Sequence, residues 1–117
     1  MKTVDLALVL DELAKRGPAS GPARRTVGVP GFDVEVVHLH PGERWEAVPR
    51  VHAALLVLGG IGTITVDDWR ASLGGGHAVG LPAGAKVVAL ADGERTLSFV
   101  VFRAEPDEAD PSAGESE

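Results

Sequence analysis

Histidine and carboxylate side chains, which bind metals and move protons, gather in one short stretch of the chain. Three of the four histidines are His38, His40 and His52, and Glu43 and Glu46 lie between them. Imidazole and carboxylate groups are common ligands of divalent transition metals. Two residues apart on a strand, His38 and His40 would share one face. The stretch therefore poses the question of a metal site.

Two interpretations of the histidine pair stay open. We expect His38 and His40 to face solvent or a sheet edge. Alternatively, the pair binds a divalent transition metal with one further ligand, either His52 or Glu43. His52 itself is expected to point outward, because its neighbour Ala53 takes the inward position.

The other polar side chains favour structural roles. His77 follows three glycines and is expected to form a turn hydrogen bond. Glu43 and Glu46 flank Trp45, and two carboxylates so close can act as acid and base, although a solvated loop is the expectation. No Ser, Cys or Tyr constellation supports nucleophilic catalysis. The glycine clusters lie between expected strands, which excludes a phosphate-binding loop before a helix.

Charge divides the chain into a body and a tail. The net charge is −6, and six of the 17 acidic residues lie in residues 104–117, which carry no base. The body is thus close to neutral, which argues against nucleic acid as a partner. The polar tail, poor in large apolar side chains, is expected to be disordered.

Targeting and membrane signals are not evident. The N-terminal segment is interrupted by Asp5, Asp11 and Glu12, unlike a signal peptide. No apolar run approaches the roughly 20 residues that span a bilayer. The chain has no cysteine, which excludes disulfides and thiolate metal sites. We expect a cytoplasmic protein with no membrane partner.

Residues 4–16 have the apolar spacing of an amphipathic helix. Thr3 or Asp5 is expected to cap its start, and Gly17–Pro18 to end it. Residues 17–31 are expected to form a loop or extended arm. The apolar helix face comprises Leu6, Val9, Leu10 and Leu13.

From Phe32 onward, short apolar segments alternate with turns, as is typical of an antiparallel sandwich or barrel. Gly59–Gly62 is expected to form a turn between two strands, and Asp92–Gly93 a hairpin-type turn. The expected strands cover residues 32–40, 51–59, 63–66, 69–73, 77–82, 86–91 and 95–104.

The segment from about Phe32 to Phe102 resembles a small single-domain cupin. Pro41–Gly42 followed by LLVLGGIGTITVDDW matches the first cupin motif, and GHAVGLPAGAKV matches the glycine–proline–glycine frame of the second. The resemblance implies an all-β, double-stranded β-helix (jelly-roll) barrel preceded by one short helix, and a homodimer. The expected organisation is a helix and arm (1–31), a barrel (32–103) and a tail (104–117).

The resemblance also implies where a metal would be bound. In metal-binding cupins, two histidines and a glutamate of the first motif and a histidine of the second hold the ion. The glutamate position falls on Ala53 and the last histidine on Val87. The histidine pair falls on Val48 and Arg50, or on Ala47 and Pro49 if the gap is set differently. None of these side chains is a metal ligand.

We therefore expect a metal-free, non-catalytic cupin-like domain that binds a small molecule or acts as a dimeric structural or sensory module. The alternative is an enzyme, either a metal-dependent dioxygenase or isomerase with displaced histidine ligands, or a metal-free epimerase or cyclase. The barrel interior is expected to be a packed core or an apolar pocket, with Arg50 at its mouth. The expected lining residues are Trp45, Val48, Arg50, Ala53, Leu55, Val57, Val79, Leu81 and Val87.

Overall fold

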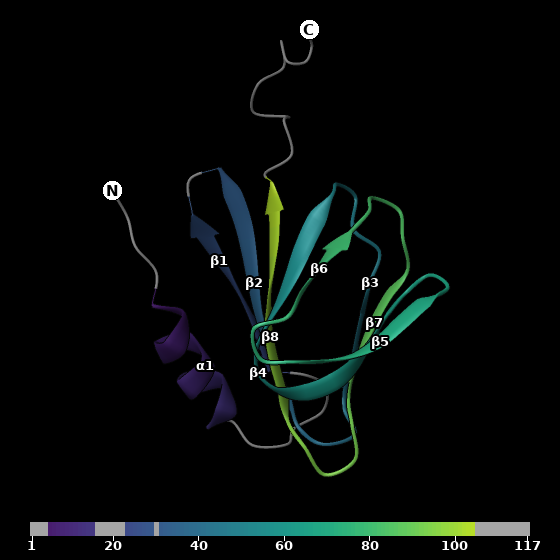
Figure 1. Ribbon diagram of the computed structural model, residues 1–117. Helices are drawn as coiled ribbons and strands as arrows, with labels where there is room; N and C mark the ends of the chain where they lie inside the picture. The colour runs from purple at the N-terminus through teal and green to yellow at the C-terminus, as the bar shows by residue number, and fades with distance from the viewer. Residues whose placement is uncertain (1–4, 16–22, 30, 105–117) are drawn as a thin grey trace, which may run out of the picture.

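A short helix precedes eight strands in the computed structural model, which describes residues 5–15, 23–29 and 31–104 (Figure 1). The predicted all-β fold with one leading helix is confirmed. The predicted disordered tail lies outside the described residues, apart from Ala104. The elements are α1 (Leu6–Ala14), β1 (Ala23–Val29), β2 (Phe32–Leu39), β3 (Arg44–Ala47), β4 (Ala53–Val66), β5 (Trp69–Gly74), β6 (Ala78–Leu81), β7 (Val87–Ala91) and β8 (Leu97–Ala104).

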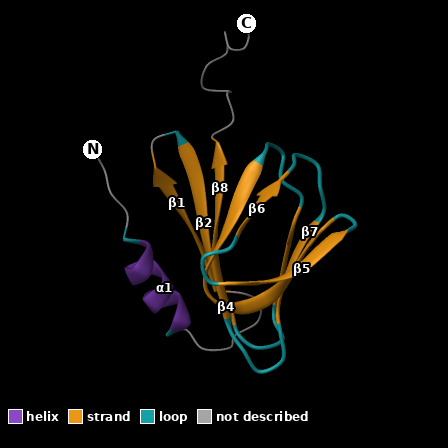
Figure 2. Cartoon of the chain, viewed as in Figure 1, coloured by secondary structure: helices purple, strands orange, loops and turns teal. Residues whose placement is uncertain are grey.

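All the strands pair antiparallel in one curled sheet that folds back on itself as two layers (Figure 2). The long strand β4 belongs to both layers. Its first half pairs with β8 and β6, and its second half pairs with β7 and β5. Strands β2 and β1 extend the first layer beyond β8, and β3 extends the second beyond β7. The main apolar core fills the space between the layers.

Strand β4 is continuous, so the predicted turn at Gly59–Gly62 is wrong. The ladder with β8 shows only an irregularity between Val57 and Gly59. Gly60 has φ +79°, and a Cβ there would lie 2.0 Å from the carbonyl oxygen of Thr96. Glycine therefore lets the strand bend tightly from one layer into the other.

Residues 23–29 form strand β1, which corrects the prediction of a loop or arm over 17–31. Every residue of β1 has a partner in β2, from Ala23 opposite His38 to Val29 opposite Phe32. The hydrogen bonds of β1 thus come from a neighbouring strand, and the basic sequence ARRTVGV gives little local sign of them. Residues 16–22 lie outside the described residues.

Helix α1 packs on the outer side of the first layer, against β1 and β2 (Figure 2). Asp5 caps the helix, as predicted, because its side chain accepts a hydrogen bond from the Leu8 N–H at 3.1 Å. Leu13 is fully buried and the rest of the predicted apolar face is partly buried. No helix in the described part of the chain is long and apolar enough to cross a membrane.

Candidate functional site

The positions at which cupins hold a metal lie on the inner side of the barrel. Ala47 of β3 is paired with Val87 of β7, and both contact the main core, as does Ala53 at the start of β4. Pro49, in the connection between β3 and β4, is buried. These four side chains offer no lone pair, so the residues do not fit a metal ion.

Val48 and Arg50 are on the outside, so the prediction that they line the interior is wrong. Val48 is 62% exposed and Arg50 is also exposed. Alternate residues of a strand face opposite sides, and Trp45 and Ala47 both contact the core. The residue after Ala47 therefore turns outward. The structure therefore favours the alignment in which the two histidine positions of the first cupin motif correspond to Ala47 and Pro49.

The other seven predicted lining residues belong to the main core or pack against it. No pocket opens between side chains in the ranges 5–15, 23–29 and 31–104. The buried members are Trp45, Leu55, Val57, Leu81 and Val87, and the partly buried ones are Ala53 and Val79.

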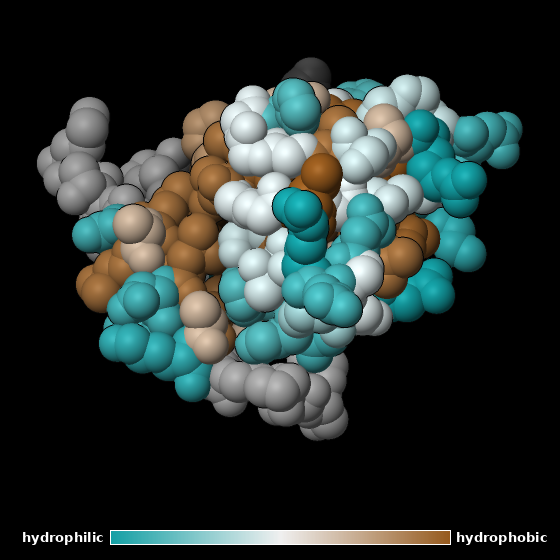
Figure 3. All heavy atoms as spheres, turned by 60° about the horizontal axis from the view of Figure 1, so that its bottom comes forward, coloured by the Kyte–Doolittle hydropathy of each residue, from teal (hydrophilic) through white to brown (hydrophobic). Residues whose placement is uncertain are grey.

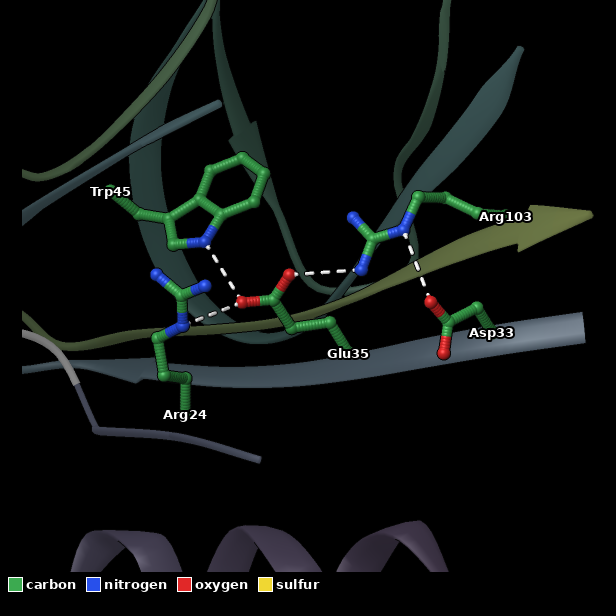
Figure 4. Close-up of polar contacts among 5 residues, drawn as sticks. All are labelled: Arg24, Asp33, Glu35, Trp45 and Arg103. Atoms are coloured by element: carbon green, nitrogen blue, oxygen red, sulfur yellow. Dashed lines mark hydrogen bonds and ion pairs between the residues drawn. The ribbon is translucent and has the colours of Figure 1, made fainter. Parts of the chain in front are cut away.

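A polar cluster that the sequence analysis missed surrounds Glu35 on the inner side of β2 (Figure 4). Its carboxylate is 4% exposed and is contacted from three other strands. Arg24 Nε of β1 lies 2.9 Å and Trp45 Nε1 of β3 lies 3.3 Å from Oε2, and Arg103 Nη2 of β8 lies 3.2 Å from Oε1. Arg103 Nε also lies 3.9 Å from Asp33 Oδ2.

This Glu35 cluster links β3 to strands of the other layer with which it does not pair. Strand β3 has no ladder with β1 or β2, and the Trp45–Glu35 hydrogen bond links β3 directly to β2. A buried carboxylate is tolerated when it is paired and hydrogen-bonded, and here both oxygens are used within the fold. The only sequence sign was Asp33 and Glu35 at alternate positions of a strand whose other residues, apart from His38, are apolar.

The histidine pair lies on the outer face of β2, away from the barrel interior. His38 Nδ1 lies 2.8 Å from Ser98 Oγ of β8, the residue opposite it in the ladder. His38 is 8% exposed and its strand is paired on both sides, so the expectation of a solvent-facing or sheet-edge residue is wrong for it. Burial lowers the pKa of His38, and the neighbouring His40 lowers it further, against a smaller opposite effect of Glu43.

The predicted alternative metal site of His38, His40 and His52 is not assembled. The rings of His38 and His40 meet edge to face, with centroids 4.9 Å apart, and their Nδ1 atoms contact Ser98 Oγ and Glu43 Oε1, respectively. His38 is paired with Ser98 of β8. His52 directly precedes Ala53, which is paired with Arg103 of the same strand. Ser98 and Arg103 are five residues apart along β8, which corresponds to about 16 Å. No group of three or more potential ligands occurs among the described residues.

The remaining candidates have separate local roles. His52 is exposed, as predicted, and its Nδ1 accepts a hydrogen bond from the Ala83 N–H. His77 forms the predicted turn hydrogen bond, accepting from the Gly74 N–H at 2.9 Å. Glu43 accepts from the His40 N–H, while Glu46 pairs with Arg44 on the surface. Glu43, Glu46 and His52 are therefore not gathered in one acid–base site.

Solved structures resemble this chain in fold. A protein with a double-stranded β-helix domain from Klebsiella pneumoniae is 21% identical, with a TM-score of 0.72 over 89% of this chain and 90% of that chain. A cupin protein from Bacteroides fragilis is 19% identical, with a TM-score of 0.62 over 79% and 83%. The Cnp3 cupin domain from Schizosaccharomyces pombe is 14% identical, with a TM-score of 0.66 over 80% and 67%. No family model and no curated protein matches the chain.

Proposed function

Because this chain has the cupin fold, a double-stranded β-helix, we propose that it is a metal-free, non-catalytic cupin domain that acts as a homodimeric structural module. The observation that carries this proposal is the chemistry of the inner positions Ala47, Pro49, Ala53 and Val87. They carry hydrocarbon where metal-binding cupins carry imidazole and carboxylate. We also propose that the protein works in the cytoplasm, which the absence of cysteine supports.

A structural module is favoured over a small-molecule carrier because the interior is filled. Trp45 is 2% exposed and meets Phe99 edge to face, with ring centroids 5.2 Å apart. Ligand pockets in proteins are typically preformed cavities of about 300–1,000 Å³, and none opens in the described part of the barrel. A carrier would need to create that volume by moving core side chains.

An enzyme is the less favoured alternative. In its metal-dependent form, the His38–His40 pair needs His52 or Glu43 as a further ligand. The strand register separates His52 from the pair, and no group of three residues placed to hold a metal ion, with Glu43 or otherwise, occurs in the described part of the chain. Its metal-free form requires a free acid and base close together, whereas Glu43 is engaged with His40 and Glu46 with Arg44. Neither set of side chains converges on a space that a substrate could occupy.

Elemental analysis of protein purified without a histidine tag tests the proposal. We expect iron, manganese, nickel and zinc each to remain far below one ion per chain, both as purified and after incubation with the metal and desalting. A value near one ion per chain would overturn the metal-free assignment. Loss of that metal in a His38→Ala variant would then place the site.

A thermal-shift screen with small acids and apolar compounds tests the choice between module and carrier. A filled core predicts no increase in melting temperature at millimolar ligand. A dose-dependent increase that an added Trp45 substitution abolishes would show that the interior binds ligand and would favour the carrier.

A further inference from the structure

We propose that protonation of the His38–His40 pair loosens the N-terminal unit, which we define as helix α1 together with strand β1, from the outer face of β2. The N-terminal unit and the remaining barrel are the two parts of the fold that separate. This acid-sensitive attachment is independent of the proposed function, because it involves neither a metal nor a second copy of the chain.

The histidine pair lies beside the most deeply buried part of the N-terminal unit. His38 points to the same side of β2 as Val34 and Val36, which pack with Leu13 of α1 in the outer apolar cluster. The partner of His38 in the ladder with β1 is Ala23, the first residue of that strand and a member of the same cluster. His38 itself is 8% exposed, so its ring reaches water only when a neighbouring element moves.

The surroundings of the pair accommodate one positive charge but not two. The ring centroids lie 4.9 Å apart, and two protonated rings at that distance repel each other. Glu43 Oε1 lies 3.3 Å from His40 Nδ1 and balances one charge, whereas the neighbour of His38 Nδ1 is the uncharged Ser98 Oγ at 2.8 Å. Burial lowers the pKa of His38, and His40 lowers it further, against the smaller effect of Glu43. A proton on His38 therefore favours an arrangement in which its ring is hydrated.

The charged groups of the surrounding elements do not balance that proton. Among the described residues, His40 and Glu43 are the charged or titratable groups that act on His38. Ala23 of β1 and Ser98 of β8, which are paired with His38, carry no charge. The other charged groups of these elements and of the connection after β7 lie in separate contacts or on the surface: Asp5 caps α1, Asp11 pairs with Lys15, Glu12 with Arg25, Arg24 with Glu35, and Arg103 with Asp33 and Glu35, Asp92 accepts a hydrogen bond from Thr63, and Glu94 and Arg95 are exposed.

Strand β1 is held less firmly than the other neighbour of β2. In the described part of the chain β1 pairs with β2 alone, whereas β8 pairs with both β2 and β4. Helix α1 packs mainly on β1 and β2, and its ion pair from Glu12 to Arg25 connects it to β1. The main polar contact that separation breaks is Arg24–Glu35, in which Arg24 is 58% exposed. The N-terminal unit can therefore open while the two layers of the barrel remain closed.

Opening of the N-terminal unit uncovers an apolar face on the first layer. Val34, Val36 and Val100 are buried in the outer apolar cluster, and Leu56 and Phe102 continue this face. Figure 3 shows apolar surface already running from the helix side towards the barrel. Acid would enlarge this surface, and large exposed apolar patches are the kind of surface that binds other proteins.

Native-state hydrogen exchange of the full chain between about pH 7.5 and pH 5.5 tests the attachment. If the N-terminal unit opens alone, the amides of α1 and β1 share one opening free energy that is lower than that of β4 and β8. In the open form His38 has its ordinary pKa of about 6.5, so acid favours opening below that pH. After correction for intrinsic exchange rates, the opening constant of the N-terminal unit should rise about three- to tenfold over this range.

Two histidine variants identify the group responsible. His38→Gln should leave an opening constant that hardly changes with pH, because the group that gains a proton on opening is gone. His52→Gln changes an exposed histidine outside the N-terminal unit and β2, and as the matched control it should keep the wild-type dependence. The proposal is overturned if α1 and β1 open only together with β4, or if His38→Gln and the wild type respond equally to acid.

A disulfide across the attachment gives a second readout that leaves His38 unchanged. Val27 and Val34 are opposite each other in the β1–β2 ladder, and the chain has no cysteine of its own. Oxidation of a Val27→Cys, Val34→Cys double variant therefore forms a single cross-link between these strands. The cross-link should suppress the acid-dependent opening of β1, whereas the reduced form of the same variant should retain it. An equal acid response in both forms would mean that β1 does not separate from β2, and would overturn the proposal.

Discussion

Replacing Glu35 by glutamine should destabilise the fold far more than the same change at a surface glutamate. The Glu35 carboxylate is 4% exposed, and it pairs with Arg103, which is 21% exposed, and with Arg24, which is 58% exposed. Glutamine keeps the size of the side chain but loses the charge and turns an N–H donor towards other donors. The variant therefore isolates the electrostatic part of the cluster from its packing.

The expected loss follows from the exposure of each partner. A hydrogen bond to a charged group contributes about 1.5–3 kcal/mol, and this applies to the Arg103 contact. Arg24 can be hydrated again, so its contact contributes less than about 1 kcal/mol. The total is about 1.5–4 kcal/mol, a large share of the 5–15 kcal/mol typical of a domain. In the control Glu46→Gln, the exposed pair with Arg44 predicts a loss of less than about 1 kcal/mol.

Urea unfolding followed by circular dichroism measures both variants. If Glu35→Gln and Glu46→Gln lose the same free energy of unfolding, the reasoning about the buried cluster is wrong. A double variant, Glu35→Leu with Arg103→Leu, provides a further check. It should recover only part of the loss, because an apolar pair can replace a buried ion pair at little cost but the buried Trp45 N–H loses its acceptor.

Three further changes have defined outcomes. Because burial and His40 lower the pKa of His38, the folded state favours its neutral form, and stability should fall as the pH drops below about 6.5. His38→Gln should reduce the difference in unfolding free energy between about pH 7.5 and pH 5.5, and an unchanged difference would contradict this cause. Gly60→Ala should cost more than about 4 kcal/mol, since its Cβ would lie 2.0 Å from the Thr96 oxygen, and a wild-type melting curve would disprove the clash. Leu13→Ala, at a fully buried residue, should cost about 2–5 kcal/mol, whereas Leu8→Ala, 55% exposed, should stay within about 0.5 kcal/mol; thermal melts compare the two.

The local sequence pattern was sufficient to predict an element where its apolar spacing is compatible with only one arrangement. The spacing of Leu6, Val9, Leu10 and Leu13 fixes which face of α1 is buried, because residues three and four apart lie together on any α-helix. The turn signals after Phe32 likewise predict many short antiparallel strands. The identity of the side chains at Ala53 and Val87 excludes metal coordination there whatever their surroundings.

Strand faces needed the tertiary structure, because shifting a strand by one residue exchanges its two sides. The sequence allowed either Val48 and Arg50 or Ala47 and Pro49 to face inward, and only the pairing of Ala47 with Val87 decided between them.

The same dependence on pairing explains the other differences between expectation and structure. Strand β1 exists because β2 supplies its hydrogen bonds, and the glycines of β4 bend a strand that passes through both layers. The partners of Glu35 come from residues 24, 45 and 103, which no local pattern relates. The composition of this protein determined what chemistry its interior can do, and the long-range pairing of its strands decided which side chains form that interior.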